Sequence, residues 1–317
     1  MSRNIVVITP VKHIRGVSET LERIGNVIYH EDPVLNDIER DLGEAWAIYT
    51  NPNKSKVYIG RELFDMAPNL KVVCTASTGR NHIDLVEAAN RSIQVISLTE
   101  EREIINRISS TAELAFALTL SHLRRVTESH QGALEGQWDY TRYIGRQMNQ
   151  LTVGVLGYGR LGGLFSGYAA AMGAQVIVSD PYKNVVNGDM QKVSLSELAA
   201  RSDILSLHVH VTDETTGIIS AEVLSEMKED VLIVNTSRGE IINETDMVAF
   251  LRAHPRARVA TDVLSDEIRN REASPLLNFA RESKQVLITQ HIGGMTREAQ
   301  EIAYGHAASL LESFSRE

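Results

Sequence analysis

The stretch VLGYGRLGGLF, residues 155–165, places glycines at positions 157, 159 and 162, the G-x-G-x-x-G spacing of a dinucleotide-binding turn. It follows the apolar run TVGVLG and precedes apolar residues at the three-and-four spacing of a helix. We expect Gly157 to permit a tight turn, Gly159 to let the backbone approach a diphosphate, and Gly162 to let helix and strand pack closely. Amides at the start of the helix would then bind the diphosphate. Glycine-rich turns also occur for structural reasons alone, but here the strand, the turn and the helix are all present.

The next apolar run indicates which dinucleotide is bound. QVIVSD, residues 175–180, predicts a second strand that ends at Asp180. An acid at this place can accept hydrogen bonds from the adenosine ribose hydroxyls. A 2′-phosphate would meet its negative charge, and no arginine follows to offset that charge. The sequence therefore predicts NAD as the cofactor and disfavours NADP.

Apolar runs alternate with helical patterns along the whole chain. Before the glycine stretch the runs are NIVVIT, NVIY, AWAIYT, KVVCTA and IQVISL. From residue 151 they are TVGVLG, QVIVSD, ILSLHVH, VLIVNTS, RVATDV and QVLITQH. Because these runs are apolar at consecutive positions, the strands are expected to be buried on both faces, as in a parallel sheet flanked by helices. The expected fold class is α/β with two doubly wound parallel-sheet domains.

Two long helices are expected outside these runs. Residues 110–134 contain few helix breakers and predict one helix that joins the two domains. Its apolar positions on one broad face are Leu114, Ala117, Leu118 and Leu120. Residues 296–316 predict a last helix with Ile302, Ala303, Leu310 and Phe314 in helical register.

Length and composition limit the class of protein. The 317 residues suit two domains of ordinary size. A net charge of −9 argues against a protein that binds nucleic acid phosphates. The single cysteine, Cys74, excludes an intramolecular disulfide framework and a cysteine-based zinc site. The apolar run near the start, Ile5 to Ile8, is too short for a signal peptide or a membrane span, so we expect a cytoplasmic protein with no membrane partner. We also expect no metal site.

Ionisable residues follow three further strands of the second half: Arg238, then Asp262 with Glu267, then His291. The carboxyl ends of parallel strands form the ligand crevice of an open sheet. Taken singly, each residue also has an ordinary structural explanation, such as a surface ion pair or a hydrogen-bonded histidine. Together they suit hydride transfer to a carbonyl acid. Arginine holds a carboxylate with a planar fork, histidine exchanges a proton near neutral pH, and a carboxylate beside the histidine favours the imidazolium.

The second half resembles the NAD-dependent D-2-hydroxyacid dehydrogenases, in the stretches GVLGYGRLG, HVHVTDETTG, VNTSRGEII, TDVLSDE, SPLL and ITQHIGGMTREAQ. The resemblance implies hydride transfer between NAD(H) and C2 of a small 2-oxo or D-2-hydroxy acid. His291 is then the acid in reduction and the base in oxidation, Glu267 orients and charges it, and Arg238 anchors the substrate. Asp262 falls on a position that faces the nicotinamide. Further cofactor contacts implied by the resemblance are Arg160, Leu161, His210, Thr215, Thr236 and Gly293.

In the first half the resemblance is thinner and rests on STGRNHID at 77–84, TAEL at 111–114 and GQW at 136–138. It implies that backbone amides around Ser77, Thr78 and Gly79 bind the substrate carboxylate. It also implies that a Rossmann NAD-binding domain, residues 105–293, is inserted into a flavodoxin-like substrate-binding domain, residues 1–104 and 294–317. A homodimer formed through the nucleotide domain and the 110–134 helix is expected from the family.

The chain departs from the family pattern at four positions. His210, Ile268 and Gln290 stand where proline is usual, and Leu264 stands where phenylalanine is common. These departures leave the catalytic residue types in place but alter their surroundings.

The substrate stays open between a phosphorylated and an unphosphorylated acid. Thr75 lies where phosphoglycerate dehydrogenases tend to carry a phosphate-binding arginine, and Lys54, Arg80 or His82 could replace it. Arg80 and His82 could equally be plain surface residues. Two other kinds of protein rank below an enzyme: a corepressor-type protein that responds to NAD(H), and an NAD-binding relative that has lost its reaction.

Overall fold

The structure, a computed structural model, describes residues 3–54, 56–183 and 188–316. The chain divides into two compact units. The first contains Met1–Ile108 and Gly294–Glu317, and the second contains Ser109–Gly293. No helix of the described residues is long and apolar enough to cross a membrane. Among the same residues, no group of three or more His, Cys, Asp or Glu side chains could hold a metal ion.

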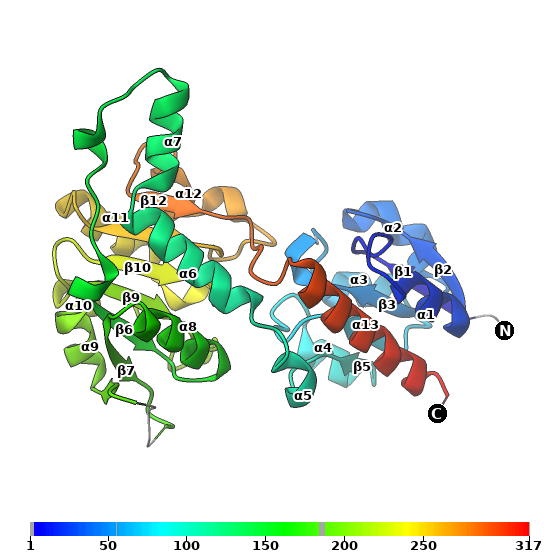
Figure 1. The fold of residues 1–317 in the computed structure, drawn as a ribbon. Helices are drawn as coiled ribbons and strands as arrows, with labels where there is room; N and C mark the ends of the chain where they lie inside the picture. The colour runs from blue at the N-terminus through cyan, green and yellow to red at the C-terminus, as the bar shows by residue number, and fades with distance from the viewer. Residues whose placement is uncertain (1–2, 55, 184–187, 317) are drawn as a thin grey trace. The chain divides into compact units, whose positions relative to one another are not determined.

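The first unit is built on a five-stranded sheet whose strands all pair in parallel (Figure 1). Their order is β2 (Asn26–Tyr29), β1 (Asn4–Val7), β3 (Ala45–Thr50), β4 (Val72–Thr75) and β5 (Gln94–Ile96). This 2-1-3-4-5 order is that of flavodoxin-like folds. One face of the sheet packs on α1 (Val17–Ile24), α5 (Arg102–Ile105) and α13 (Arg297–Phe314). The other face packs on α2 (Leu35–Leu42), α3 (Arg61–Met66) and α4 (Leu85–Asn90).

Helix α13 confirms the helix expected at 296–316 and returns the chain to the first sheet. The Tyr49 hydroxyl donates a hydrogen bond of 2.7 Å to the carbonyl of Tyr304. The buried face of the helix consists of Ala299, Tyr304, Ala307, Ala308 and Leu311. Ile302, Ala303, Leu310 and Phe314, the positions taken from the sequence, are only partly buried. Three of these five buried residues are alanines.

The second unit is built on a seven-stranded parallel sheet. Its order is β12 (Val286–Ile288), β11 (Arg258–Thr261), β10 (Leu232–Asn235), β9 (Ile204–Leu207), β6 (Thr152–Leu156), β7 (Gln175–Ser179) and β8 (Gln191–Lys192). This is the Rossmann order, which reverses between β6 and β9. One face packs on α6 (Ser110–Leu123) and α8 (Arg160–Ala171). The other packs on α9 (Leu195–Arg201), α10 (Ala221–Ser225), α11 (Glu244–Ala253) and α12 (Pro275–Ala280). The expected fold class is confirmed, and the two-residue edge strand β8 was not expected.

The single helix expected at 110–134 is wrong. The chain forms α6 and then α7 (Val126–Leu134), with Arg125 between them in the left-handed region at φ 53°. In a continuous helix the carbonyl of Leu123 would accept from residue 127. Here it accepts from the amide of Arg146, at 3.2 Å. A Cβ on Gly145 would lie 2.3 Å from that same carbonyl, so a glycine is needed where the returning chain passes the end of α6.

The apolar face expected for this helix is only partly right. Leu118 is buried, Leu114 and Leu120 are half-buried, and Ala117 is exposed. Buried positions of α6 include the polar residues Thr119 and His122. The remaining elements are single 3-10 turns: η1 (Pro52–Lys54), η2 (Tyr140–Tyr143), η3 (Met148–Gln150), η4 (Gly239–Ile241) and η5 (Arg271–Ala273).

Candidate active site

The glycine turn joins β6 to α8 in a form that suits a diphosphate. Gly157 has φ 91°, and a Cβ there would lie 2.6 Å from the carbonyl of His208. A Cβ on Gly162 would lie 2.0 Å from the carbonyl of Gly157, so helix and strand could not pack this closely with any other residue. Around Gly159, the N-cap of α8, no described heavy atom lies within 4 Å of where a Cβ would be. The turn therefore leaves open space beside the positive end of a helix, where a phosphate is favoured.

Asp180 connects the end of β7 to this turn. Its side chain is 9% exposed, and its Oδ2 accepts from the amide of Tyr158 at 2.7 Å. Its Oδ1 accepts from the amide of Tyr182 at 2.8 Å. Each carboxylate oxygen has a second lone pair with which it can accept from a ribose hydroxyl. Arg160 and Leu161 open α8 and are half-buried, and burial lowers the pKa of Arg160.

The remaining residues expected to bind cofactor lie after β9 and β10. His210 is exposed, and its carbonyl accepts from the Thr215 hydroxyl at 2.5 Å. That hydroxyl also accepts from the amide of Thr212 at 2.8 Å, so the loop is tied to itself. Thr236 is 6% exposed, and its Oγ1 has no hydrogen-bond partner within the described residues. A buried hydroxyl in this state fits a ligand that would complete its hydrogen bonding.

His291 and Glu267 meet at the carboxyl ends of β12 and β11. Nδ1 of His291 and Oε1 of Glu267 are 2.5 Å apart, and the two side chains are 16% and 17% exposed. The Leu264 amide donates to Oε2 of Glu267 at 3.2 Å. Burial acts to raise the pKa of Glu267, but the hydrogen bond and charge of His291, the Leu264 amide and the charge of Arg238 hold that pKa below its ordinary value. Glu267 is therefore an ionised carboxylate against the ring.

Asp262 fixes the loop that carries His291. It is 1% exposed, and its Oδ1 accepts from the Thr289 hydroxyl at 2.5 Å and from the Ile292 amide at 2.9 Å. Its Oδ2 accepts from the Gly293 amide at 2.8 Å, and its carbonyl accepts from the His291 amide at 2.9 Å. These bonds hold His291 at φ 55°, a conformation that costs energy for a residue with a side chain. The expected contact of Asp262 and Gly293 with the cofactor stays a prediction.

Arg238 places a cation beside the pair. Burial lowers its pKa, and the charges of Glu267 and Glu240 oppose that effect. Its Nη1 donates to the carbonyl of Ser237 at 2.6 Å, and it forms no ion pair with any described residue. A Cβ on Gly239 would lie 1.9 Å from the carbonyl carbon of Leu264, so the turn after Arg238 packs directly on the segment that leads to Glu267. The structure thus brings Arg238, Glu267 and His291 together, with a guanidinium that can bind an anion.

Three residues of this region were missed from the sequence. Gly239 follows Arg238 directly, and a glycine after a candidate arginine was a usable signal. Glu244 is 6% exposed, and nothing in the helical pattern of α11 distinguishes it from a surface acid. The carbonyl and Cβ of His208 approach the glycine turn, its ring Nε2 is 2.8 Å from the Ser206 hydroxyl, and burial lowers its pKa to about 3. Its place in the apolar run ILSLHVH, directly after β9, was a signal for a neutral, structural histidine.

The loop expected to bind the substrate carboxylate lies in the first unit, after β4. The Gly79 amide donates to Oγ of Ser77 at 3.1 Å, and the carbonyl of Thr78 accepts from the Thr99 hydroxyl at 2.9 Å. The amides of Ser77 and Thr78 form no hydrogen bond with the part of the chain that the structure describes. Two of the three amides are therefore available for an anion, and the third is engaged by a side chain.

Of the residues considered as phosphate ligands, His82, Arg80 and Lys54, the first two do not share one environment. His82 is fully buried, contrary to the alternative that made it a surface residue, and its Nε2 is 3.0 Å from the Thr75 hydroxyl. Arg80 is exposed. The side chain of Lys54 lies outside the described part of the chain.

Comparison with known proteins gives the family. Residues 116–293 match the model of the D-isomer specific 2-hydroxyacid dehydrogenase NAD-binding domain. The hydroxypyruvate reductase of Blautia hydrogenotrophica is 32% identical over 305 residues, which are 93% of this chain and 90% of that protein. A D-lactate dehydrogenase from Aquifex aeolicus, solved with NAD and lactic acid, superposes with a TM-score of 0.80 at 26% identity, covering 99% of this chain and 96% of that one.

A third relative is longer than this chain. The D-3-phosphoglycerate dehydrogenase of Mycobacterium tuberculosis is 34% identical over 258 residues, which are 79% of this chain but 46% of that protein. The chain thus spans about half the length of several phosphoglycerate dehydrogenases that it matches. The resemblance seen in the sequence, the enzyme class and NAD as the cofactor are confirmed. The chain belongs to the D-isomer specific 2-hydroxyacid dehydrogenases, a family of NAD-dependent oxidoreductases.

Proposed function

We propose that this chain interconverts a small 2-oxo acid and the matching D-2-hydroxy acid. The observation that carries the proposal is the 2.5 Å contact between His291 and Glu267, next to the Arg238 guanidinium, at the carboxyl ends of the strands of the NAD-binding unit. When bound, NADH supplies the hydride that adds to C2 of the 2-oxo acid. The protein must supply the proton for the carbonyl oxygen and a group that holds the acid in place.

We assign proton transfer to Nε2 of His291, because Nδ1 is engaged by Glu267. In reduction the imidazolium gives its proton to the carbonyl oxygen, and in oxidation the neutral ring takes the hydroxyl proton. The ionised Glu267 favours the imidazolium and keeps the ring in one orientation. Asp262 contributes indirectly, because its bonds to the amides of Ile292 and Gly293 fix the backbone that follows His291.

We assign the substrate carboxylate to Arg238. A guanidinium in a partly buried place with no ion-pair partner among the described residues gains most from an added anion, and its fork matches a carboxylate. The carbonyl next to that carboxylate is then polarised for attack. In the first unit we propose the amides of Ser77 and Thr78 as a second anion-binding group.

We propose that the cofactor is held by groups along the carboxyl edge of the second sheet. The glycine turn and Arg160 take the diphosphate, Asp180 takes the adenosine ribose, and the Thr236 hydroxyl lies on the nicotinamide side. Leu161, His210, Thr215, Asp262 and Gly293 complete the proposed contacts. The charge of Asp180 supports NAD over NADP, since a 2′-phosphate would be repelled.

The proposed substrate is unphosphorylated and about the size of hydroxypyruvate. Of the residues considered as phosphate ligands, His82 is buried against Thr75 and Arg80 is exposed. The relative matched over most of its length is named a hydroxypyruvate reductase. Both observations favour a small polar acid.

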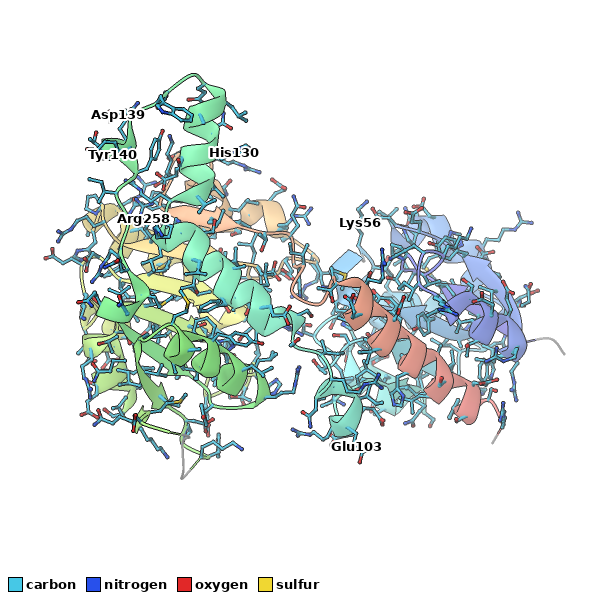
Figure 2. The ribbon with its side chains drawn as sticks, viewed as in Figure 1. Lys56, Glu103, His130, Asp139, Tyr140 and Arg258 are labelled. Atoms are coloured by element: carbon cyan, nitrogen blue, oxygen red, sulfur yellow. The ribbon has the colours of Figure 1, made fainter. Side chains whose placement is uncertain are left out.

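We further propose a homodimer in the cytoplasm. Figure 2 shows His130 on α7 and Asp139 and Tyr140 on the segment that follows it. Four large apolar or aromatic side chains of this region are 69% to 94% exposed: Leu134, Trp138, Tyr140 and Ile144. Surface of this kind is typical of protein interfaces. Sedimentation velocity on the full chain and on Trp138→Ser measures whether this surface joins two copies.

The decisive experiment follows NADH absorbance with hydroxypyruvate, glyoxylate, pyruvate and 3-phosphohydroxypyruvate. We expect turnover with at least one unphosphorylated acid, and a loss of about 100-fold or more in His291→Ala. NADH binding by that variant, followed by fluorescence, should stay close to wild type. Tight NADH binding without oxidation by any of the four acids would refute the proposal and favour a protein that responds to NAD(H) without turnover.

A further inference from the structure

We propose that Glu244 is a positioning residue for the acid–base pair, because it clamps both ends of the loop that carries Glu267. The inference rests on the proposed function, in which Glu267 charges and orients His291. Glu244 is the first residue of α11 and stands just beyond the VNTSRGEII stretch that contains Arg238.

Both carboxylate oxygens of Glu244 are used on this loop. Oε1 accepts from the Ser265 amide at 2.8 Å. Oε2 accepts from the Ser274 hydroxyl at 2.6 Å and from the Leu276 amide at 3.3 Å. The residue is 6% exposed, and a buried carboxylate is tolerated only when it is well hydrogen-bonded. One donor at the start of the loop and two at the start of α12, where the loop ends, therefore converge on one acid.

Glu267 lies between these two anchoring points. Ser265 precedes it by two residues, and Asp266, the residue between them, turns the chain in the left-handed region at φ 50°. Beyond Glu267 the chain forms only the short turn η5 before it reaches Ser274, the N-cap of α12. The loop thus has no strand or long helix of its own to fix Glu267. The bonds to Glu244 set where the loop starts and where it ends.

An acid in the first turn of a helix has a more ordinary explanation, namely a favourable charge at the positive end of the helix dipole. Asp246, in the same turn of α11, fits that explanation. It is half-buried, and its Oδ2 accepts from the amide of Ala221 at the start of α10, at 2.9 Å, away from the loop of Glu267. Glu244 differs because it is buried and because both of its oxygens point to the segment that carries Glu267. Asp246 is the matched control.

The test uses the full chain with four substitutions: Glu244→Gln, Asp246→Asn, Ser274→Ala and His291→Ala. Kinetics with NADH and hydroxypyruvate give kcat, KM and the pH dependence of kcat. Hydrogen exchange on the peptide spanning 264–276 gives the mobility of the loop. NADH fluorescence shows that each variant is folded.

We expect Glu244→Gln to lower kcat by about tenfold or more, since a misplacement on the order of 1 Å is costly in catalysis. The alkaline limb of the reduction profile should move to lower pH, because the imidazolium loses the support of a fixed carboxylate. Exchange should rise within 264–276 and not in the sheet, and NADH affinity should be unchanged. Asp246→Asn should behave as wild type, and Ser274→Ala should shift the profile in the same direction by a smaller amount.

Three outcomes overturn the inference: a wild-type kcat in Glu244→Gln, a lower kcat with an unmoved pH profile, or faster exchange across the whole unit. If Glu244→Gln does not bind NADH, Ser274→Ala decides, and an unshifted profile in that variant overturns the inference. A His291→Ala variant that keeps its activity instead refutes the proposed function, whatever Glu244 does. The two failures are therefore distinguishable.

Discussion

Asp262→Asn keeps the shape of a buried side chain and removes one of its two carboxylate oxygens. The wild-type carboxylate accepts three hydrogen bonds from the loop that carries His291: from Thr289, Ile292 and Gly293. Asparagine has one acceptor oxygen, and its amide group would face either the Ile292 or the Gly293 amide, donor against donor. Because residue 262 is only 1% exposed, water cannot replace the lost hydrogen-bond acceptor.

The expected cost follows from these contacts. A hydrogen bond to a charged group contributes about 1.5–3 kcal/mol, and a buried donor left without a partner costs about 1–3 kcal/mol. At least one bond is lost, and the others weaken as the charge disappears. We therefore expect the free energy of unfolding of the 109–293 unit to fall by roughly 2–4 kcal/mol. For a unit of this size that corresponds to a transition temperature lower by about 5–15 °C.

Calorimetry on the full chain measures the transition temperature of the 109–293 unit, because a chain with two compact units can show separate transitions. Thr289→Val is the control, because it removes one donor and leaves both backbone amides paired; its transition should fall by less than that of Asp262→Asn. Turnover of Asp262→Asn should also fall, because the backbone around His291 is less well fixed. An unchanged transition temperature combined with weaker NADH binding would show that Asp262 acts only on the cofactor, and the reasoning would be refuted.

Further predictions concern the substrate, the cofactor and pH. Arg238→Lys should raise KM for the 2-oxo acid and leave NADH affinity unchanged, because a point charge cannot reproduce the guanidinium fork; an unchanged KM would contradict the assigned role. Asp180→Ala should lower the preference for NAD over NADP by about tenfold or more, measured as the ratio of kcat/KM values, and a wild type that prefers NADP would overturn the argument. Burial lowers the pKa of His122 from 6.5 to about 4, so the unfolded chain binds a proton that the folded chain resists. The free energy of unfolding should then decrease by roughly 3 kcal/mol as pH falls from 6.5 to 4, and His122→Gln should show a smaller decrease in urea titrations.

Much of the fold could be predicted from local patterns. The strands of both sheets, apart from β8, follow from runs of consecutive apolar residues, and their parallel pairing follows from burial on both faces. The glycine turn could be predicted in detail, because the backbone at Gly157 and Gly162 excludes any side chain. These are features that a few neighbouring residues determine.

The break between α6 and α7 could not be predicted in this way. The break falls at Arg124 and Arg125, and the sequence has no Gly or Pro there to end the helix. The break depends on a later segment, because the amide of Arg146 donates to the Leu123 carbonyl that would otherwise continue the helix. It also depends on the Arg125 guanidinium, which donates to the carbonyl of Arg142 at 2.8 Å. A contact between distant segments here overrides helix propensity.

In the candidate site, too, some residues could be predicted from local sequence and others could not. The residue types expected at strand ends come together, since Glu267 bonds to His291 and the charge of Arg238 acts on Glu267. What the sequence did not indicate is the support behind them. Glu244 has the pattern of a surface acid, and only the fold shows its two oxygens turned to the loop of Glu267.

The order of the two units along the chain has a consequence for biosynthesis. Residues 1–108 are synthesised before 109–293. The face of their sheet that packs on Val17 and Leu21 of α1 is also covered by α13, which is synthesised only after the whole of 109–293. The inserted unit can close on itself earlier, because the position of a Cβ on Gly293 is 3.1 Å from Thr111, so its two ends lie together. We therefore expect the inserted unit to complete its fold before the first unit does, against the usual N-terminal-first order. The first-made segment waits with an apolar face uncovered, and that nascent state is where chaperone binding would matter most.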